Sequence, residues 1–267
     1  MKSIIEKILI ITGIALMIFL MGFSTLNHQK RACDSLNIRI DYGQREFTSN
    51  MMLTPDDIND LIRLNFDSIK GKKLKDINLE HIQKTISQNN YVKDINVSQE
   101  IDGTIAIVLN QRRPIIRVFG ISGNSFYIDE NGTAIPVKSG YPARVVIASG
   151  AIDDRLFEGD NINLFDTSQN ATNGIESLRN LYKMAKYLDR NEFLRKEITQ
   201  IHILPDGKIS LIPLVGNHLI EMHSFDNLDK KLRKLELFYK KAMNQGGWGK
   251  YSKINIEYKN QIVCTKI

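Results

Sequence analysis

The stretch YVKDINVSQEIDGTIAIVLNQRRP, residues 91–114, predicts how the first folded unit of the chain is built. Apolar residues alternate with polar ones on either side of Asp102 and Gly103, as in strands that bury one face. An Asp-Gly pair between two such runs is a favoured tight turn, so we expect a hairpin here. Residues 112–114 end the unit, because a different rhythm of short strands begins after them.

Two helices and one further strand are predicted ahead of this hairpin. LNIRIDY at 36–42 alternates like a strand, Thr54 is a good N-cap with Pro55 at the first helical position, and a second helix opens near Asn78. Each helix carries one apolar stripe, which needs a surface that buries it. The order strand, helix, helix, strand, strand over residues 36–112 therefore predicts a small α+β domain with both helices on one face of a sheet.

Short strands dominate the remainder of the chain, residues 113–267. SFYIDENGTAIPV at 125–137 predicts another hairpin, with its turn at Asn131-Gly132. Residues 153–174 are mostly polar and predict a surface loop. A helix is expected to follow from about Ile175 to Leu188, where apolar residues recur at helical spacing.

A second helix of this region is predicted in SFDNLDKKLRKLELFYKKAM, residues 224–243. Ser224 or Asp226 would cap it. Its apolar residues share one face: Leu228, Leu232, Leu235 and Tyr239. Its basic side fits lipid headgroups or, more simply, a helix that packs on a sheet and shows its lysines to water. The fold class expected for residues 113–267 is therefore a larger mixed β domain with two helices.

The last residues, KINIEYKNQIVCTKI at 253–267, predict two short strands. Apolar and polar residues alternate from Ile254 to Tyr258, a turn follows at 259–261, and a second strand runs from Ile262 to Thr265. The outermost strand of a sheet leaves a row of backbone groups unpaired, which invites pairing with another chain. We therefore expect this terminal hairpin to present an open edge to a partner.

An uncharged apolar run, ILIITGIALMIFLMGFSTLN, extends from Ile8 to Asn27. As a helix it would measure about 30 Å, the thickness of the hydrocarbon core of a bilayer. The alternative is a cleaved signal peptide, but its apolar region is usually shorter and small residues follow it, whereas bulky and basic residues follow here. We therefore predict an uncleaved transmembrane helix at 8–27, between a tail at 1–7 and a connector at 28–35.

Lysine and arginine flank this helix on both sides, so the charge rule alone does not orient it. Very short N-terminal flanks of single-span proteins commonly stay in the cytoplasm. We therefore expect residues 1–7 in the cytoplasm and the bulk of the chain beyond the cytoplasmic membrane.

The composition does not favour an enzyme or a nucleic-acid-binding protein. The chain has 267 residues and a formal net charge of +6, but its lysines and arginines are interleaved with acids. The densest basic run, KGKKLK at 70–75, contains no aromatic residues for base stacking, so a basic loop is the simpler interpretation. The five histidines form no H-E-x-x-H motif, and no phosphate-binding glycine loop occurs. We expect no catalytic, cofactor or metal site, no nucleic-acid partner and no small-molecule substrate.

The two cysteines, Cys33 and Cys264, lie almost at opposite ends of the chain and lack the spacing of metal ligands. A chain of this length does not need a disulfide to hold a core. Whether the two thiols form one is left open by the sequence.

The order of a short tail, one anchor, one small unit and a strand-rich domain resembles the FtsQ/DivIB family of bacterial cell-division proteins. The unit at 36–112 is similar to a POTRA domain, the polypeptide-transport-associated module of bacterial envelope proteins. SFYIDENGTAIPV at 125–137 resembles the hairpin that opens the family's β domain, and KINIEYKNQIVCTKI at 253–267 resembles its last two strands. The ending with Cys264 resembles the branch of the family found in the Bacteroidota.

The resemblance implies a non-enzymatic divisome adaptor of the inner membrane, located at the division septum with its bulk in the periplasm. In the family, the β domain binds FtsB, which travels with FtsL, by accepting a partner strand at the late edge of its sheet. The POTRA domain assists recruitment alongside other divisome proteins. By position, the resemblance implies partner-binding roles for Lys208, Lys253, Asn255, Glu257 and Tyr258. The family prefers arginine where Lys208 stands, and a lysine offers a point charge without the bidentate fork.

A POTRA-like unit also fits a second function, an envelope adaptor in protein translocation or outer-membrane assembly. Proteins of that kind carry several POTRA repeats and a long β barrel. The sequence shows one such unit and too few residues for both, so we prefer the cell-division interpretation.

Overall fold

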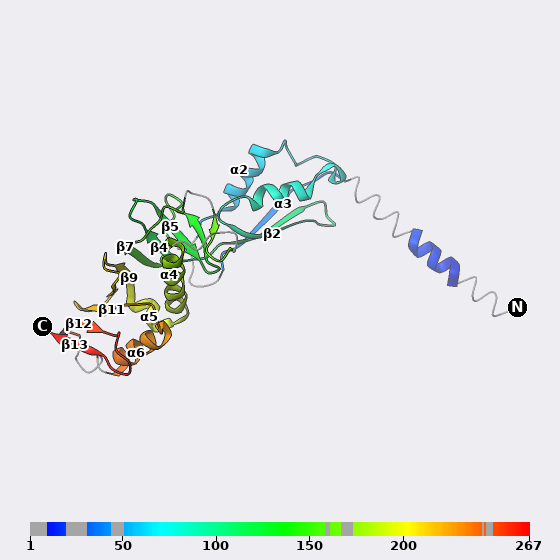
Figure 1. Cartoon of the computed structure of the whole chain (residues 1–267). Coiled ribbons are helices and arrows are strands. Elements are labelled where there is room, and N and C mark those ends of the chain that lie inside the picture. The colour runs from blue at the N-terminus through cyan, green and yellow to red at the C-terminus, as the bar shows by residue number, and fades with distance from the viewer. Residues whose placement is uncertain are drawn as a thin grey trace. The chain divides into compact units, whose positions relative to one another are not determined.

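The computed structural model describes residues 10–19, 31–43, 51–157, 161–166, 173–241, 243 and 248–267. The chain divides into two compact units, which Figure 1 shows from blue at the N-terminus to red at the C-terminus. Unit 1 comprises Met1–Gly43 and Leu53–Gln111, and unit 2 comprises Gln44–Met52 and Arg112–Ile267. The main division therefore falls between Gln111 and Arg112.

Half of the predicted transmembrane segment at 8–27 lies outside the described residues. Residues 10–19 form a helix, whereas the tail at 1–7 and the first residues of the connector, 28–30, are among those that the structure does not describe. In the part of the chain that the structure describes, no helix has both the length and the apolar character that a membrane crossing requires.

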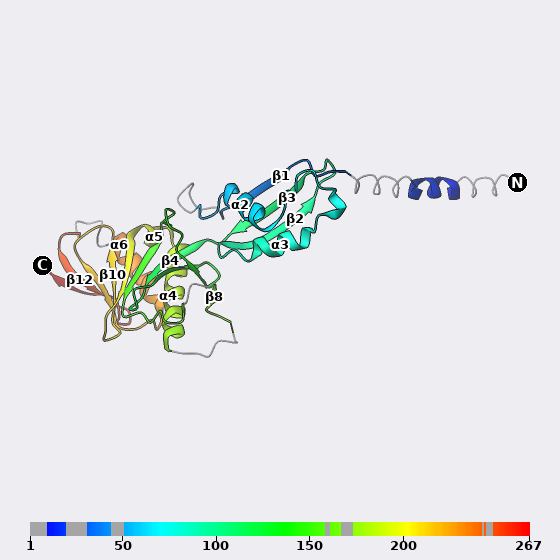
Figure 2. The same ribbon diagram turned by 90° about the horizontal axis from the view of Figure 1, so that it is seen from above.

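Unit 1 is a small sheet covered by two helices. Its elements are β1 (Leu36–Asp41), α2 (Pro55–Asn65), the 3₁₀ helix η1 (Leu74–Asp76), α3 (Leu79–Ser87), β2 (Val92–Gln99) and β3 (Ile105–Gln111). The sheet order is β1-β3-β2, with β1 parallel and β2 antiparallel to β3, as Figure 2 shows. The predicted order of strands and helices is confirmed, with η1 as an addition.

The helix starts of unit 1 follow from local hydrogen bonds. Thr54 caps α2 in a capping box, because its hydroxyl accepts from the Asp57 backbone N–H while the Asp57 carboxylate accepts from the Thr54 N–H at 2.7 Å. Asn78 caps α3 by accepting from the N–H of His81 at 2.9 Å. Both predicted helix starts are therefore confirmed, and each is satisfied by side chains that lie next to it in the sequence.

The core of unit 1 lies between these helices and one face of the sheet. Its buried residues from α2, α3 and β3 are Ile58, Ile62, Ile82, Ile86, Ile105, Ile107 and Leu109. Cys33 belongs to the same core and is 1% exposed. Residues 31–35, predicted as part of a connector, therefore pack into unit 1, and Ala32 pairs there with Lys73 in an isolated bridge.

Unit 2 is built on one long sheet. Its elements are β4 (Pro114–Phe119), β5 (Ser125–Asp129), β6 (Thr133–Pro136), β7 (Val146–Gly150), β8 (Ile162–Asn163), α4 (Asn173–Arg190), α5 (Glu192–Glu197), β9 (Ile198–Ile203), β10 (Ile209–Pro213), β11 (Leu219–Met222), α6 (Leu228–Lys241), β12 (Tyr251–Asn255) and β13 (Val263–Lys266). The ten strands follow the order β13-β12-β11-β10-β9-β7-β4-β5-β6-β8. β7 is parallel to β4 and β9, and β12 is parallel to β11.

The helices of unit 2 bury their apolar stripes against this sheet. Alternate strand residues, among them Val118, Ile201 and Ile254, share one cluster with Leu181 of α4 and Leu235 of α6. The amphipathic spacing that predicted α4 and α6 thus corresponds to burial on a sheet, which is the simpler of the two interpretations offered for the basic helix.

Several boundaries in unit 2 differ from the predictions. The segment 153–174, expected as a loop, contains the short strand β8, which pairs with β6. The helix α5 was not predicted; at six residues it is too short to show a periodic stripe, and the side chain of Asn191 caps it. The predicted caps of α6 are wrong, because the helix begins at Leu228, directly after Asn227 with a φ of 51°.

Candidate partner-binding edge

The terminal hairpin does form the end of the long sheet, but its outer strand is β13 and not β12. β12 pairs with β11 on one side and with β13 on the other, so it is an interior strand. Among the residues that the structure describes, β13 pairs with β12 alone, and it therefore presents the open edge. β12 and β13 lie next to each other at the C-terminal end of unit 2 in Figure 1.

The open edge is defined by the backbone groups that β13 turns away from β12. The N–H of Ile256 donates to the carbonyl of Glu221 at 3.0 Å, so even-numbered residues of this segment face β11. Asn255 consequently faces β13, where it pairs with Val263. Because successive residues of a strand point their backbone groups to opposite sides, the N–H and C=O of Cys264 and the N–H of Lys266 point outward.

The side chains of β13 give this edge a mixed chemistry. Val263 is 45% exposed, and Thr265 and Lys266 are exposed as well. Cys264 is half-buried, carries a free thiol and packs against the core of unit 2; burial raises the pKa of that thiol. Cys33, in unit 1, is a free thiol as well.

Two of the predicted site residues, Lys253 and Asn255, lie within β12. The Lys253 ammonium donates to the Glu221 carboxylate at 2.8 Å across to β11. The Asn255 side chain accepts from the N–H of Glu257 at 2.9 Å, which turns the chain at the end of the strand. Both residues therefore stand one strand inside the edge at which they were expected.

Glu257 is occupied by contacts within the protein. Its carboxylate accepts from the ammonium of Lys231 at 2.7 Å and from the N–H of His223 at 2.8 Å. Lys231 is only 5% exposed and also donates to the carbonyl of Ser224 at 3.0 Å. Burial alone would raise the pKa of Glu257, but these hydrogen bonds outweigh it and lower the pKa on balance.

Tyr258 lies after β12, in the turn that leads to β13, and is 48% exposed. Its carbonyl accepts from Lys234 of α6, whose ammonium also donates to the carbonyl of Ile256 at 2.9 Å. Lys231 and Lys234 both bind the segment 256–258. We call these two lysines and that segment the lysine clamp. The clamp fixes the connection between β12 and β13, and thereby the position of the edge strand.

Lys208 lies apart from the open edge. It stands in the turn before β10, three places from β13 in the sheet order, and its ammonium donates to the Asp206 carboxylate at 2.7 Å. Lys208 is exposed, and its pKa is raised first by that hydrogen bond and in smaller part by the charge of Glu221. Of the five predicted residues, the structure groups Lys253, Asn255, Glu257 and Tyr258 around one hairpin and leaves Lys208 outside it.

The residues that form the edge itself, Val263 to Lys266, were missed as site residues. The signal was present in the sequence, since the second terminal strand was predicted at nearly these positions. The family resemblance placed the predicted binding residues on the first strand of the hairpin instead.

Comparisons with known proteins agree with this architecture. Residues 31–110 match a family described as POTRA-like domain. The chain is 35% identical over 66 residues to the Cell division protein FtsQ of Rickettsia bellii (strain RML369-C), a match that spans 25% of this chain and 24% of that protein. Residues 113–265 match the family described as FtsQ/DivIB, C-terminal related. Since this match covers more than half of the chain, the protein belongs to the FtsQ/DivIB C-terminal related family.

Proposed function

We propose that this protein is a non-enzymatic scaffold of cell division that binds a partner by adding a strand to β13. Its family membership indicates a role in cell division. The observation that carries the finer proposal is the open edge, at which Cys264 and Lys266 turn three backbone groups away from β12. A partner strand gains affinity from main-chain hydrogen bonds to such groups and specificity from the side chains on either face.

The proposed partner is FtsB, together with FtsL, as the family resemblance implies. The exposed side chains of Val263 and Thr265 would contact one face of the added strand. The half-buried Cys264 and the exposed Lys266 would contact the other. Lys253 and Tyr258, both exposed, are proposed as flanking contacts. We propose Lys208 as a contact for a more distant part of the partner. Asn255 and Glu257 are proposed to support the edge indirectly, because they hold the connection between β12 and β13.

The proposal includes a membrane anchor at residues 8–27, with 1–7 in the cytoplasm and both units in the periplasm at the septum. The support is the length of the uncharged run and its bulky, basic flank. The protein should therefore fractionate with the inner membrane at its full length of 267 residues. Recovery of a shortened, soluble periplasmic chain would contradict this part of the proposal.

The decisive experiment substitutes Cys264, because its N–H points outward. Cys264→Pro removes that donor without removing a ladder bond to β12, and the proline ring obstructs an incoming strand. We expect Cys264→Pro to weaken the binding of FtsB, measured by calorimetry with the full-length protein, by about tenfold or more, since one main-chain bond contributes about 1 kcal/mol and the obstruction adds to it. Cys264→Ala, the matched control, keeps the N–H and should change affinity by less than about threefold.

Two outcomes would count against the proposal. If Cys264→Pro binds FtsB as the wild type does while its melting curve is unchanged, strand addition at β13 is excluded. If the protein instead captures components of outer-membrane assembly, the POTRA-like unit at 31–110 points to the alternative envelope function.

A further inference from the structure

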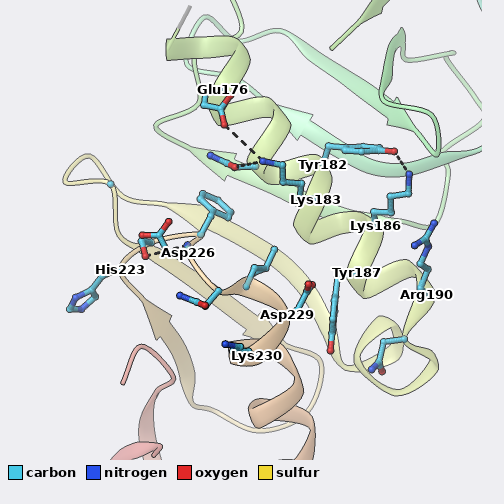
Figure 3. Close-up of a pocket in the computed structure, with 17 residues that line it drawn as sticks. Glu176, Tyr182, Lys183, Lys186, Tyr187, Arg190, His223, Asp226, Asp229 and Lys230 are labelled. Carbon is cyan, nitrogen blue, oxygen red and sulfur yellow. Dashed lines mark hydrogen bonds and ion pairs between the residues drawn. The ribbon is translucent and has the colours of Figure 1, made fainter. Parts of the chain in front are cut away.

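A second feature of unit 2, separate from the sheet edge, is a polar groove between α4 and the connection from β11 to α6. Its volume is about 1230 Å³. Figure 3 shows α4 as one wall, carrying Lys183, Tyr187 and Arg190, and the segment with Asp226 and Lys230 as the other. None of the residues of β12 or β13 lines it.

One face of α4 is turned into this groove along most of the helix. Its lining residues on that face recur three and four positions apart: Glu176, Asn180, Lys183, Tyr187 and Arg190. Such spacing places side chains in one row along a helix. From Glu176 to Arg190 the row is about 21 Å long, so the groove is elongated along α4.

The α4 wall is basic. Lys186 lies beside this row, where its ammonium donates to the Tyr182 hydroxyl at 2.5 Å. Among the described residues, Lys186 and Arg190 of this wall form no ion pair with a carboxylate, and neither does Lys230 on the opposite wall. Lys183 has Glu176 at 4.0 Å, with both side chains more than half exposed, which is a weak pair.

The opposite wall carries two carboxylates with Lys230 beside them. Asp226 and Asp229 line it near the start of α6, and both are exposed. Burial, and then the negative charges of Glu236 and Asp229, raise the pKa of Tyr187, whose ring lies half-buried between the two helices. The groove thus has cations along α4, two carboxylates and one lysine on the other wall, and an aromatic residue between the walls.

We propose that this groove binds an acidic stretch of a second protein chain, laid along α4. The volume exceeds the roughly 300–1,000 Å³ of small-molecule pockets, and the lining is charged where such pockets are mainly apolar. A flat membrane surface does not enter a concave channel. A polyphosphate backbone would meet Asp226 and Asp229, whereas a peptide places its own carboxylates against α4 and its N–H groups against these two aspartates.

The spacing of the cations defines a suitable probe. Lys183 and Arg190 are seven residues apart, or about 10 Å along the helix. In a peptide with the polyproline II conformation, residues three apart lie on the same face and are separated by about 9 Å. The probe is therefore a fluorescein-labelled peptide of four Glu-Ser-Leu repeats, and its uncharged twin carries Gln in place of each Glu.

Fluorescence anisotropy with the full-length protein at low salt tests the proposal. The Glu peptide should bind about tenfold more tightly than the Gln twin, and the double variant Lys183→Glu/Arg190→Glu should weaken its binding about tenfold or more. Lys84→Glu, at an exposed lysine of α3 in unit 1, is the matched control and should leave affinity within about twofold. Lys183→Gln/Arg190→Gln repeats the test with neutral, helix-favouring residues if the charge reversal lowers the melting temperature.

Three results would overturn the proposal. The first is equal affinity for the two peptides, and the second is a loss of affinity in the groove variant, Lys183→Glu/Arg190→Glu, no larger than in Lys84→Glu. The third is a preference for phosphatidylglycerol over phosphatidylcholine vesicles that the groove variant loses, while the Glu peptide does not bind. The first two show that the groove is an ordinary solvated surface, and the third assigns it to lipid. FtsB binding, measured in parallel, should be unchanged in the groove variant, which separates this test from that of the β13 edge.

Discussion

The lysine clamp predicts that Lys231 stabilises unit 2 far more than an ordinary surface lysine. Lys231→Met keeps the length of the side chain and removes the charge that Glu257 faces at 2.7 Å. Glu257 then keeps the N–H of His223 but loses its cation, in a site where its side chain is 25% exposed and that of Lys231 only 6%. Removal of one partner from a buried pair costs about 3–5 kcal/mol, and the partial exposure of Glu257 favours the lower end.

We therefore expect a loss of about 3 kcal/mol in the free energy of unfolding of unit 2. For a unit of this size, each kcal/mol lowers the melting temperature by about 2–4 °C, which gives a shift of about 6–12 °C. The chain has one tryptophan, Trp248, which stacks on Tyr239 of α6 with ring centroids 5.4 Å apart, so its fluorescence reports on this unit. Urea unfolding of the full-length protein, followed by that fluorescence, provides the measurement.

A second lysine provides the control. Lys253 pairs with Glu221 at 2.8 Å, but the two side chains are 50% and 30% exposed. Lys253→Met should therefore cost less than about 1 kcal/mol. The double variant Lys231→Met/Glu257→Gln should recover part of the loss, because no uncompensated charge stays buried. If Lys231→Met destabilises unit 2 no more than Lys253→Met does, the clamp is not a stabilising element and the reasoning is refuted.

Other variants test the remaining inferences. The pKa of Glu257 is lowered from its ordinary value of 4.5. The stability that the clamp contributes should therefore be complete above about pH 4.5 and should disappear as the pH falls through the lowered pKa. A difference in the free energy of unfolding between wild type and Glu257→Gln that persists in acid would contradict this. Asn255→Pro places a proline in an interior strand, so we expect loss of the native tryptophan signal, and a normal unfolding curve would show that β12 is not paired on both sides. Gly150→Ala should destabilise unit 2 by more than about 1 kcal/mol. Gly150 has a φ of 101°, and an added Cβ would lie 2.0 Å from the carbonyl oxygen of Ile203. An unchanged urea unfolding curve would disprove that contact.

The sequence was most informative where structure depends on neighbouring residues. The capping box of Thr54 and the Asn78 cap join residues three positions apart, and the turn after Ile101 needs only a glycine that adopts a positive φ at position 103. The apolar stripes of α4 and α6 were equally legible, because burial on a sheet imposes the helical period directly on the sequence. The short α5 and the two-residue strand β8 were missed, since neither is long enough to display a period.

The candidate site shows the opposite case. The alternation from Ile254 to Tyr258 identified a strand but not its neighbours, and a strand with two partners has the same period of two as a strand with one. Only the tertiary structure shows that β12 lies between β11 and β13 and that the open edge is formed by Cys264 and Lys266. Likewise, Glu257 was expected to meet a partner protein, and only the fold brought Lys231, 26 residues away, to its carboxylate. The sequence by itself determined the strands and helices that are long enough to show a period, because such signals act locally. The fold decided which backbone groups and charges stay unpaired, because pairing depends on residues far apart in the chain.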